Sequence, residues 1–334
     1  MSDPNDYTIL WICAITTEYV AAQAFLDEKD PKPRAGTIAS SDTNAYTLGR
    51  ISGHRVVLAV LPKGEYGVGS AAGVITHLVR SFPNIRIGLM VGVGGGAPTK
   101  AKDIRLGDVV VSSPEDEYGG VYHYDLGKQV QDSGFRQTGF LDQPPTVVRT
   151  AVNSLEATHV LEGHRIMQNI EDALNRYPRL KRQGYACPPS ENDRLYKADI
   201  VHPEPKESCD SCCGMESAKM VIRHPRDKED DNPAIHYGLI GSGNKVIKDA
   251  TLRDKLAGEK GVLCFEMEAA GLMNRFPCLV VRGICDYSDS HKNKQWQGYA
   301  AMTAAAYAKE ILVEIPCEDV SQEKCLAVAL KQRE

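Results

Sequence analysis

Short apolar runs rich in valine and isoleucine recur along the chain, bounded by glycine, proline and charged residues. They cover residues 8–15, 55–61, 86–93, 108–113, 235–242 and 277–284. Their successive positions are apolar, whereas a half-exposed strand would alternate apolar and polar residues. The runs therefore predict strands that are buried on both faces, as in a sheet covered by helices.

Segments with apolar residues at helical spacing lie between these runs. They cover residues 16–28, 68–82, 151–177, 244–259, 267–276 and 296–315. Strands that alternate with helices are typical of layered α/β domains. We predict an α/β fold with three αβα layers around a twisted, mostly parallel central sheet.

One segment interrupts this alternation. Residues 177–233 are rich in proline, lysine, arginine, aspartate and cysteine and show no clear period. Long stretches of this kind are uncommon inside a compact domain, so we predict an insertion. We expect residues 1–315 to form a single domain that carries this insertion, and residues 316–334 to form a polar tail or linker.

Composition narrows the classes of function. The chain has 334 residues, a net charge of −5, 42% hydrophobic and 25% charged residues, which are ordinary globular values. The acidic balance lacks the basic footprint of a nucleic-acid-binding protein. No apolar run approaches the roughly 18–20 residues that span a bilayer. We therefore expect neither a nucleic-acid nor a membrane partner, and a cytoplasmic location, since most of the 10 cysteines sit singly in apolar runs.

Cys209, Cys212 and Cys213 are the exception among the cysteines. With His202 or His224 nearby, they are ligand types suited to structural zinc. The segment has one C-x2-C pair and no second pair, which falls short of a zinc-binding pattern. From the sequence we favour unliganded thiols or a local disulfide and predict no metal site.

Acidic residues follow buried strands at several points along the chain. Glu18 comes after the first predicted strand, Glu266 and Glu268 lie in LCFEMEAAG, and Asp286 follows the run at 277–284. Ionised carboxylates are costly to bury, so acids at the ends of different strands predict a lined cleft. The glycine-rich turn VGVGGGAP lacks both the dinucleotide-binding spacing and the Lys-Ser/Thr of a P-loop.

The motifs ICAITTE, GVGGGAP, RLGDVVVS, GLIGSGN, FEMEAAG and VVRGICDYSD together resemble the nucleoside phosphorylase/nucleosidase family. The nearest branch is the methylthioadenosine/S-adenosylhomocysteine nucleosidase type. The whole chain also resembles fungal nucleoside-phosphorylase-like domains, which often lie at the N-terminus of larger regulatory proteins. The resemblance covers residues 7–125 and 234–315 and implies a phosphorylase/hydrolase-like fold.

The resemblance implies a role for each acid. Asp286 corresponds to the acid that donates a proton or hydrogen bond to purine N7. Glu268 corresponds to the glutamate that accepts hydrogen bonds from the ribose hydroxyls, and Glu18 to the one that deprotonates the attacking water. The implied substrate-binding residues are Met267, Glu266, Arg282, Gly94, Gly95, Ser242, Asn244 and Ile247.

The region after Asp286 suggests which substrate is preferred. In relatives it closes the pocket near the ribose 5′ substituent, and here it contains Lys292, Lys294 and Trp296. Cationic donors suit a 5′-hydroxyl or 5′-phosphates better than a thioether. We predict a purine nucleosidase, an N-glycosyl hydrolase that cleaves adenosine or an adenine nucleotide such as ATP, needs no cofactor and assembles as a homo-oligomer.

Two alternatives remain open at this stage. Phosphorylases of the family bind phosphate with arginines and a glycine-rich loop after the first strand, where this chain has Glu18. A carboxylate repels phosphate and suits water, so we prefer hydrolysis to phosphorolysis. The other alternative is a catalytically inactive nucleoside-sensing module of a larger regulatory protein.

Overall fold

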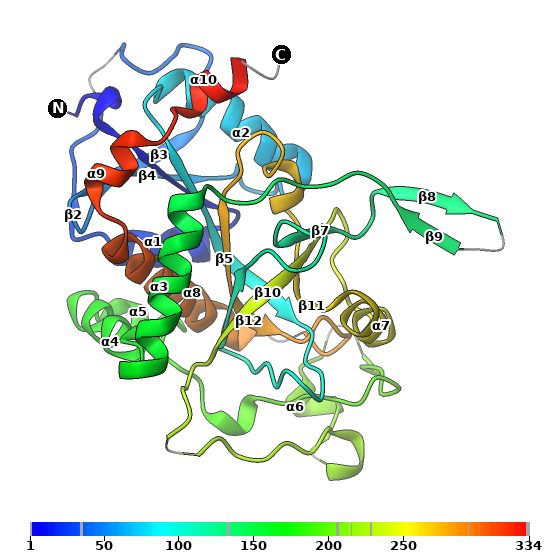
Figure 1. Ribbon diagram of the computed structural model, residues 1–334. Helices are drawn as coiled ribbons and strands as arrows, with labels where there is room; N and C mark the ends of the chain where they lie inside the picture. The colour runs from blue at the N-terminus through cyan, green and yellow to red at the C-terminus, as the bar shows by residue number, and fades with distance from the viewer. Residues whose placement is uncertain are drawn as a thin grey trace.

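A central sheet of ten strands dominates the computed structural model, which describes residues 2–33, 36–131, 134–204, 207–214, 216–227, 229–292 and 294–331 (Figure 1). The strand order is β11 (Val262–Glu266), β10 (Ile235–Ser242), β6 (Val109–Ser112), β12 (Leu279–Asp286), β5 (Ile87–Gly96), β1 (Ile9–Cys13), β4 (His54–Val60), β3 (Ala45–Ile51) and β2 (Glu28–Lys29), and β7 (Val121–His123) pairs with β10. The pairs β1–β4, β1–β5, β5–β12 and β6–β10 are parallel. The sheet is therefore mostly parallel, as the apolar runs predict.

The sheet turns back on itself through its longest strand, β5. Gly95 and Gly96 at the end of β5 pair antiparallel with Phe265 and Cys264 of β11. The same end of β5 also pairs with β12, where Gly95 faces Asp286. The carboxyl ends of β5, β11 and β12 therefore meet at one place.

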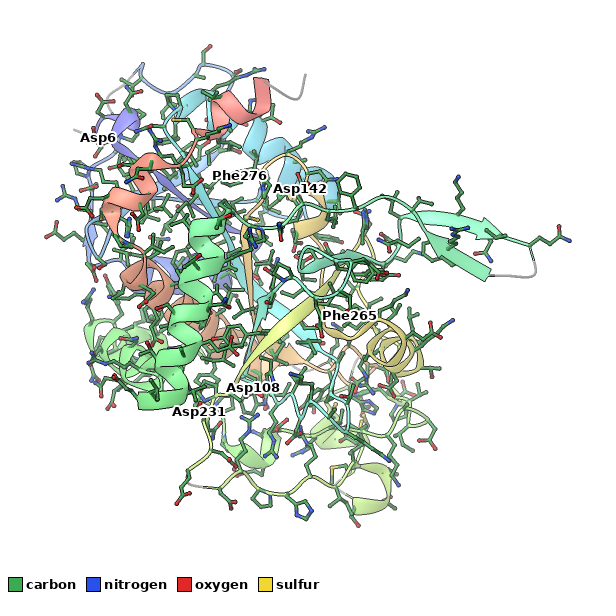
Figure 2. All side chains as sticks on the ribbon, in the orientation of Figure 1. Asp6, Asp108, Asp142, Asp231, Phe265 and Phe276 are labelled. Atoms are coloured by element: carbon green, nitrogen blue, oxygen red, sulfur yellow. The ribbon has the colours of Figure 1, made fainter. Side chains whose placement is uncertain are left out.

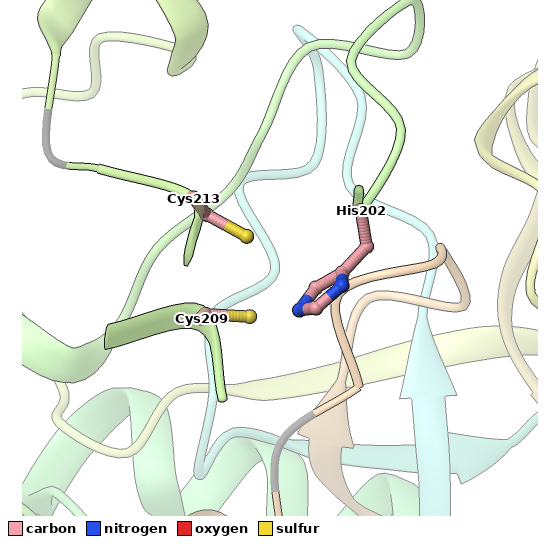
Figure 3. A group of neighbouring side chains, drawn as sticks. All are labelled: His202, Cys209 and Cys213. Atoms are coloured by element: carbon pink, nitrogen blue, oxygen red, sulfur yellow. The ribbon is translucent and has the colours of Figure 1, made fainter. Parts of the chain in front are cut away.

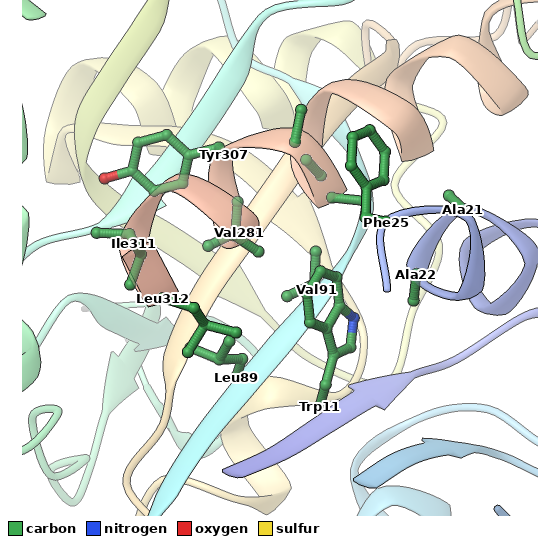
Figure 4. Packing of buried hydrophobic residues seen from close by; sticks show 14 of the residues in the cluster. Trp11, Ala21, Ala22, Phe25, Leu89, Val91, Val281, Tyr307, Ile311 and Leu312 are labelled. Atoms are coloured by element: carbon green, nitrogen blue, oxygen red, sulfur yellow. The ribbon is translucent and has the colours of Figure 1, made fainter. Parts of the chain in front are cut away.

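Both faces of the sheet are covered by helices. Along β1, Ile9 and Trp11 belong to one core cluster, while Leu10 and Ile12 belong to another. The first cluster includes α1 (Thr16–Ala24), α3 (Thr146–Glu162), α4 (Ile166–Arg176) and α8 (Gln297–Glu314), and Figure 4 shows α8 against β1 and β5. The second includes α2 (Val68–Ser81). This arrangement confirms the predicted three-layer αβα fold.

The helix predicted at 244–259 begins only at Ala250, after its N-cap Asp249, and two other predicted helices differ more strongly from the observed structure. Residues 151–177 form two helices, because α3 ends at Gly163 (φ 75°) before α4 begins. The predicted helix at 267–276 is wrong: the α-helical pattern gives way to one 3-10 turn, Ala269–Gly271. Side chains satisfy the N–H groups at its start, since Glu266 accepts from Ala269 and Ser242 accepts from Ala270. Pro277 disfavours helical geometry at Phe276, the last residue of the predicted helix.

The segment between α4 and β10 contains, among its described residues, only the short helices α5 (Arg179–Arg182) and α6 (Cys209–Cys212) and two 3-10 turns. In Figure 1, α5 lies beside α4, whereas α6 lies below the sheet. Arg226 ties the segment to the sheet by donating to both carboxylate oxygens of Asp108, at 2.6 and 2.5 Å. Figure 2 labels Asp108 at this junction. We call residues 177–233 the insertion.

Three further elements complete the chain. The hairpin of β8 (Gly127–Val130) and β9 (Gly134–Gln137) projects from the body, and α7 (Ala250–Lys260) precedes β11. The segment expected as a polar tail forms α9 (Cys317–Gln322) and α10 (Leu326–Lys331), with Val320 and Leu326 buried. Within the described ranges, no helix combines the length and apolar character needed to cross a membrane.

Candidate active site

A cavity of about 280 Å³ opens where the ends of β5, β11 and β12 meet. Small-molecule sites usually measure about 300–1,000 Å³ and occur at the carboxyl ends of parallel strands. The cavity collects most of the residues singled out from the sequence: Glu18, Gly94, Gly95, Ile247, Glu266, Met267, Glu268, Asp286 and Lys292.

Two larger hollows, of about 1060 and 620 Å³, lie between the insertion and the sheet domain. Their walls share the stretch Val221–Arg226 and contain none of Glu18, Glu268 and Asp286. A site is better indicated by polar groups that converge than by volume alone. We therefore place the candidate active site in the smaller cavity.

Arg282 lies beneath this cavity and organises three of the acids that line it. Its side chain is 1% exposed and ion-pairs with Glu266, with Glu268 at 3.5 Å and with Glu18 at 3.9 Å. Burial by itself lowers the pKa of Arg282, but the three carboxylates raise it above its ordinary value. The guanidinium is thus a fixed positive charge committed to these acids.

Glu18 reaches the cavity from the first turn of α1. Its carboxylate accepts hydrogen bonds from the backbone N–H of Ala14 at 2.6 Å, of Ile15 at 3.1 Å and of Val93 at 2.8 Å. Burial raises the pKa of Glu18, while Arg282 and these N–H groups oppose the rise. A carboxylate has about four acceptor positions, so roughly one remains for a further donor.

Glu268 and Glu266 differ in how much of their hydrogen-bonding capacity is free. Burial, with Glu266 second, raises the pKa of Glu268 to about 7. Its oxygens accept only long hydrogen bonds from described residues, from Gly67 N–H at 3.4 Å and Met267 N–H at 3.3 Å. Glu266 instead accepts from Arg282 and from the N–H groups of Glu268 and Ala269. Glu268 is therefore available to a ligand, whereas Glu266 mainly positions Arg282.

Asp286 closes the opposite part of the wall together with Lys292. The Lys292 ammonium lies 3.1 and 3.0 Å from the two Asp286 oxygens. The N–H of Ser288 donates to Asp286 at 2.9 Å, and Ser288 has a positive φ of 53°. A left-handed conformation is uncommon for serine and is typical of sites where backbone geometry is imposed by function.

Two glycines of β5 make room for these acids. A Cβ at Gly92 would meet the Glu18 carboxyl carbon at 2.5 Å and an Arg282 nitrogen at 2.6 Å. A Cβ at Gly95 would meet an Asp286 oxygen at 2.7 Å. The close approach of backbone to carboxylate explains the run of glycines at the end of this strand.

Five residues singled out from the sequence lie outside the cavity lining. Arg282 lies beneath it, Ser242 is buried and accepts from Ala270 N–H, and Asn244 accepts from Val68 N–H at the start of α2. Trp296 packs against Tyr299 and lines the 620 Å³ hollow instead, and Lys294 is exposed. The first three support the walls, whereas Lys294 and Trp296 do not contribute to the cavity.

Among the lining residues that have no counterpart in the sequence-based assignment, four carry a hydroxyl, ammonium or amide group: Tyr66, Lys245, Ser288 and Gln297. Tyr66 is 62% exposed and lies in the glycine-rich segment KGEYGVG, and an aromatic residue within such a segment is the signal that the sequence offers. Lys245 and Ser288 lie next to or near residues that were singled out. Nothing in the sequence marks Gln297.

Comparison with solved structures identifies this architecture. The 5′-methylthioadenosine/S-adenosylhomocysteine nucleosidase of Neisseria meningitidis, in complex with methylthio-immucillin-A, superposes with a TM-score of 0.54 at 16% identity, over 92% of this chain and 98% of that one. The futalosine hydrolase of Helicobacter pylori gives 0.51 at 14% identity, over 92% and 97%. The chain has the nucleoside phosphorylase/nucleosidase fold. At these identities the likeness defines the fold of the chain and not its reaction.

A relative by sequence is a nucleotide-binding leucine-rich repeat (NLR)-like protein of Hyaloscypha variabilis, 46% identical over 315 residues. The match covers 92% of this chain, which spans 29% of the length of that relative. No protein-family model matches the sequence. A domain with the nucleosidase fold thus has a close sequence counterpart inside a much longer NLR-like protein.

Proposed function

We propose that this chain is a purine nucleosidase that hydrolyses the N-glycosidic bond of adenosine or an adenine nucleotide such as ATP, releasing adenine and the ribose moiety. The observation that carries the proposal is the Glu18 carboxylate, which lines the cavity with one acceptor position left over. That position suits a water molecule, whose proton Glu18 accepts as the oxygen attacks C1′ of the ribose.

The other acids act on the two products of bond cleavage. Glu268 accepts hydrogen bonds from the ribose hydroxyls, and its charge favours the positive ribosyl centre that develops in the transition state. Asp286 and Lys292 form the group that faces the purine. Lys292 is a proton donor in contact with both Asp286 oxygens, so the pair delivers a proton or hydrogen bond to N7 as the base leaves.

Hydrolysis is favoured over phosphorolysis by the charges around Glu18. Arg282, the buried cation beside it, is already paired with Glu18, Glu266 and Glu268. A phosphate in this position would face carboxylates that no free arginine among the described lining residues offsets. Water carries no such penalty.

Adenine release from adenosine, ATP and methylthioadenosine, measured by chromatography with and without phosphate, tests the reaction. We expect free ribose or its phosphorylated form as the second product. A phosphate requirement with ribose 1-phosphate as product would contradict the role of Glu18, and a clear preference for methylthioadenosine would contradict the substrate assignment.

Substitutions test the individual roles. Asp286→Asn and Glu18→Gln should each lower turnover by about 10²–10⁴-fold, as for loss of a general acid or base. Glu65→Gln is the matched control, because Glu65 is exposed and outside the cavity. Turnover of Asp286→Asn within a few-fold of wild type would rule out this acid.

A Lys292 variant distinguishes two possible roles of this lysine, which are proton donation together with Asp286 and binding of the 5′-phosphates of a nucleotide. If it belongs to the acid pair, Lys292→Met slows the cleavage of adenosine and of ATP equally. If it binds 5′-phosphates instead, the loss is confined to ATP and raises KM. Lys294→Met is the control, since Lys294 does not line the cavity.

A second candidate function is a nucleoside-sensing module of a larger regulatory protein, favoured by the NLR-like relative. Purified chain that binds adenosine in calorimetry but releases no adenine would establish it. The cytoplasmic location and the homo-oligomeric state stay predictions, and light scattering in solution tests the second.

A further inference from the structure

The insertion gathers sulfur and imidazole ligands at one point. Cys209, Cys213 and His202 present ligand atoms that all lie within 4.8 Å of one another, and Figure 3 shows both thiols directed at the imidazole. The Cys212 sulfur lies 3.6 Å from His202 Nε2 and 3.7 Å from the Cys213 sulfur. All of these cysteines are free thiols.

These separations match a tetrahedral metal site. With Zn–S bonds of about 2.3 Å and Zn–N bonds of about 2.0–2.1 Å, the edges of a tetrahedron measure about 3.8 Å between two sulfurs and about 3.6 Å between sulfur and nitrogen. The Cys212 sulfur matches these values, at 3.7 Å from the Cys213 sulfur and 3.6 Å from His202 Nε2. The ligand atoms of His202, Cys209 and Cys213 are already gathered within 4.8 Å of one another, and Cys212 adjoins two of these three residues. The single turn α6 brings the thiols together, since residues three and four positions apart share a helix face.

The thiols have weak alternatives for their polar atoms. Cys209 contacts the His291 carbonyl at 3.8 Å, and Cys212 contacts the Ser208 carbonyl at 3.2 Å. A buried thiol that acts as a small hydrophobe requires no imidazole and no further thiols around it. Convergence of three such groups, with Cys212 adjoining two of them, is what a soft-ligand metal site requires.

We propose that the insertion binds one zinc ion through His202, Cys209 and Cys213, and that Cys212, which lies beside His202 and Cys213, moves in as the fourth ligand when the ion binds. Four protein ligands leave no open position, so the site is structural rather than catalytic. Each thiol loses its proton on binding and coordinates as thiolate.

The zinc site is attached to the loop that follows Asp286. The backbone N–H of His202 donates to Ser290 Oγ at 2.9 Å, and the Tyr196 ring stacks on the His291 ring with centroids 3.9 Å apart. Zinc therefore holds the insertion against the segment from Tyr287 to Lys292. If the proposed hydrolysis is correct, the ion also fixes the Asp286–Lys292 pair in the cavity wall.

Elemental analysis of protein purified under reducing conditions, supplied with zinc and freed of excess, tests the site. We expect about one zinc per chain and a large loss in Cys209→Ser and Cys213→Ser. Cys187→Ser is the matched control, because Cys187 is an exposed thiol of the same insertion outside the cluster. Absence of stoichiometric zinc in the wild type, equal zinc in all variants, or a disulfide within the cluster would overturn the proposal.

Hydrogen exchange gives a second readout that is independent of turnover. Removing the metal with a chelator should speed exchange in residues 287–292, and adding zinc should restore protection. Unchanged hydrogen exchange in residues 287–292 would refute the idea that zinc holds the insertion against this loop. Zinc content and exchange do not require hydrolysis, so failure of the proposed enzyme activity would leave both results interpretable.

Discussion

Replacing Arg282 by methionine removes the guanidinium that contacts Glu18, Glu266 and Glu268 and keeps most of the side-chain volume. At an effective dielectric constant of about 20, unit charges at the 3.5 and 3.9 Å separations to Glu268 and Glu18 attract by roughly 4–5 kcal/mol each. Repulsion among the acids and desolvation offset part of this. Breaking buried pairs costs about 3–5 kcal/mol, and we expect Arg282→Met to lower the free energy of unfolding by that amount at about pH 8.

The loss in Arg282→Met should shrink at acid pH. The pKa of Glu268 is about 7 in the folded protein, above its ordinary value, and removal of a cation raises it further. A carboxyl with a raised folded pKa stabilises the fold at low pH, and this stability is lost as pH rises through the folded pKa. Arg282→Met should therefore lower the free energy of unfolding more at about pH 8 than at about pH 5.5.

Urea unfolding at these two pH values measures the effect. Arg50→Met is the matched control, because Arg50 is 42% exposed and pairs with Glu28, which is 70% exposed, and with Asp30, which is 7% exposed, whereas Arg282 is 1% exposed. Arg50→Met should lose only about 0–1 kcal/mol. A loss below about 1 kcal/mol for Arg282→Met, or a loss that does not depend on pH, would refute the reasoning.

Three further outcomes are expected. Gly92→Ala should displace the Glu18 carboxyl and abolish adenine release. Gly73→Ala, at an open position in α2, should leave activity unchanged and gain about 0.5–1 kcal/mol of stability. Equal activity of the two variants would contradict the role given to Gly92. The rate should fall with decreasing pH through the Glu268 pKa of about 7, and Glu268→Gln should flatten this limb in a pH profile. Burial raises the pKa of Asp108, but Arg226 and His236 outweigh burial and lower the pKa below its ordinary value. The stabilisation from Asp108 is therefore present at neutral pH and is lost as pH falls through the lowered pKa. Asp108→Asn should make the insertion more susceptible to limited proteolysis at neutral pH, and unchanged proteolysis would argue against Asp108 as its anchor.

The strands are predictable where burial on both faces leaves an unbroken apolar run. β1, β5 and β12 show this pattern, since they occupy the middle of the sheet. The apolar runs do not predict β3, because it pairs antiparallel near the edge and is only partly buried. Its polar and glycine positions interrupt the run on which the prediction depends.

The acids of the cavity are predictable because carboxylates are conspicuous after apolar strands. The separate roles of Glu18, Glu266 and Glu268 are not predictable, because they depend on which carboxylate oxygens already accept hydrogen bonds from the backbone and from Arg282. The pairing of Lys292 with Asp286 is not predictable either, because the left-handed turn at Ser288 is what folds the chain back to join them.

Trp296 shows how the insertion limits prediction from sequence. It is buried immediately before α8, and its indole N–H donates to the carbonyl of Asn192 in the insertion at 3.3 Å. Placing this side chain therefore requires knowing how the insertion folds against the start of α8. Proximity to Asp286 in the sequence wrongly favours a place in the cavity wall.

The place of β12 in the sheet sets when the candidate active site can form during synthesis of the chain. β12 lies between β5 and β6, although it is the last of the described strands to be translated. Until it leaves the ribosome, the middle of the sheet is missing, and neither Arg282 nor Asp286 has joined Glu18. A nascent chain therefore carries no assembled acid cluster, and a hydrolase that consumes adenine nucleotides would be inert while it is still being made.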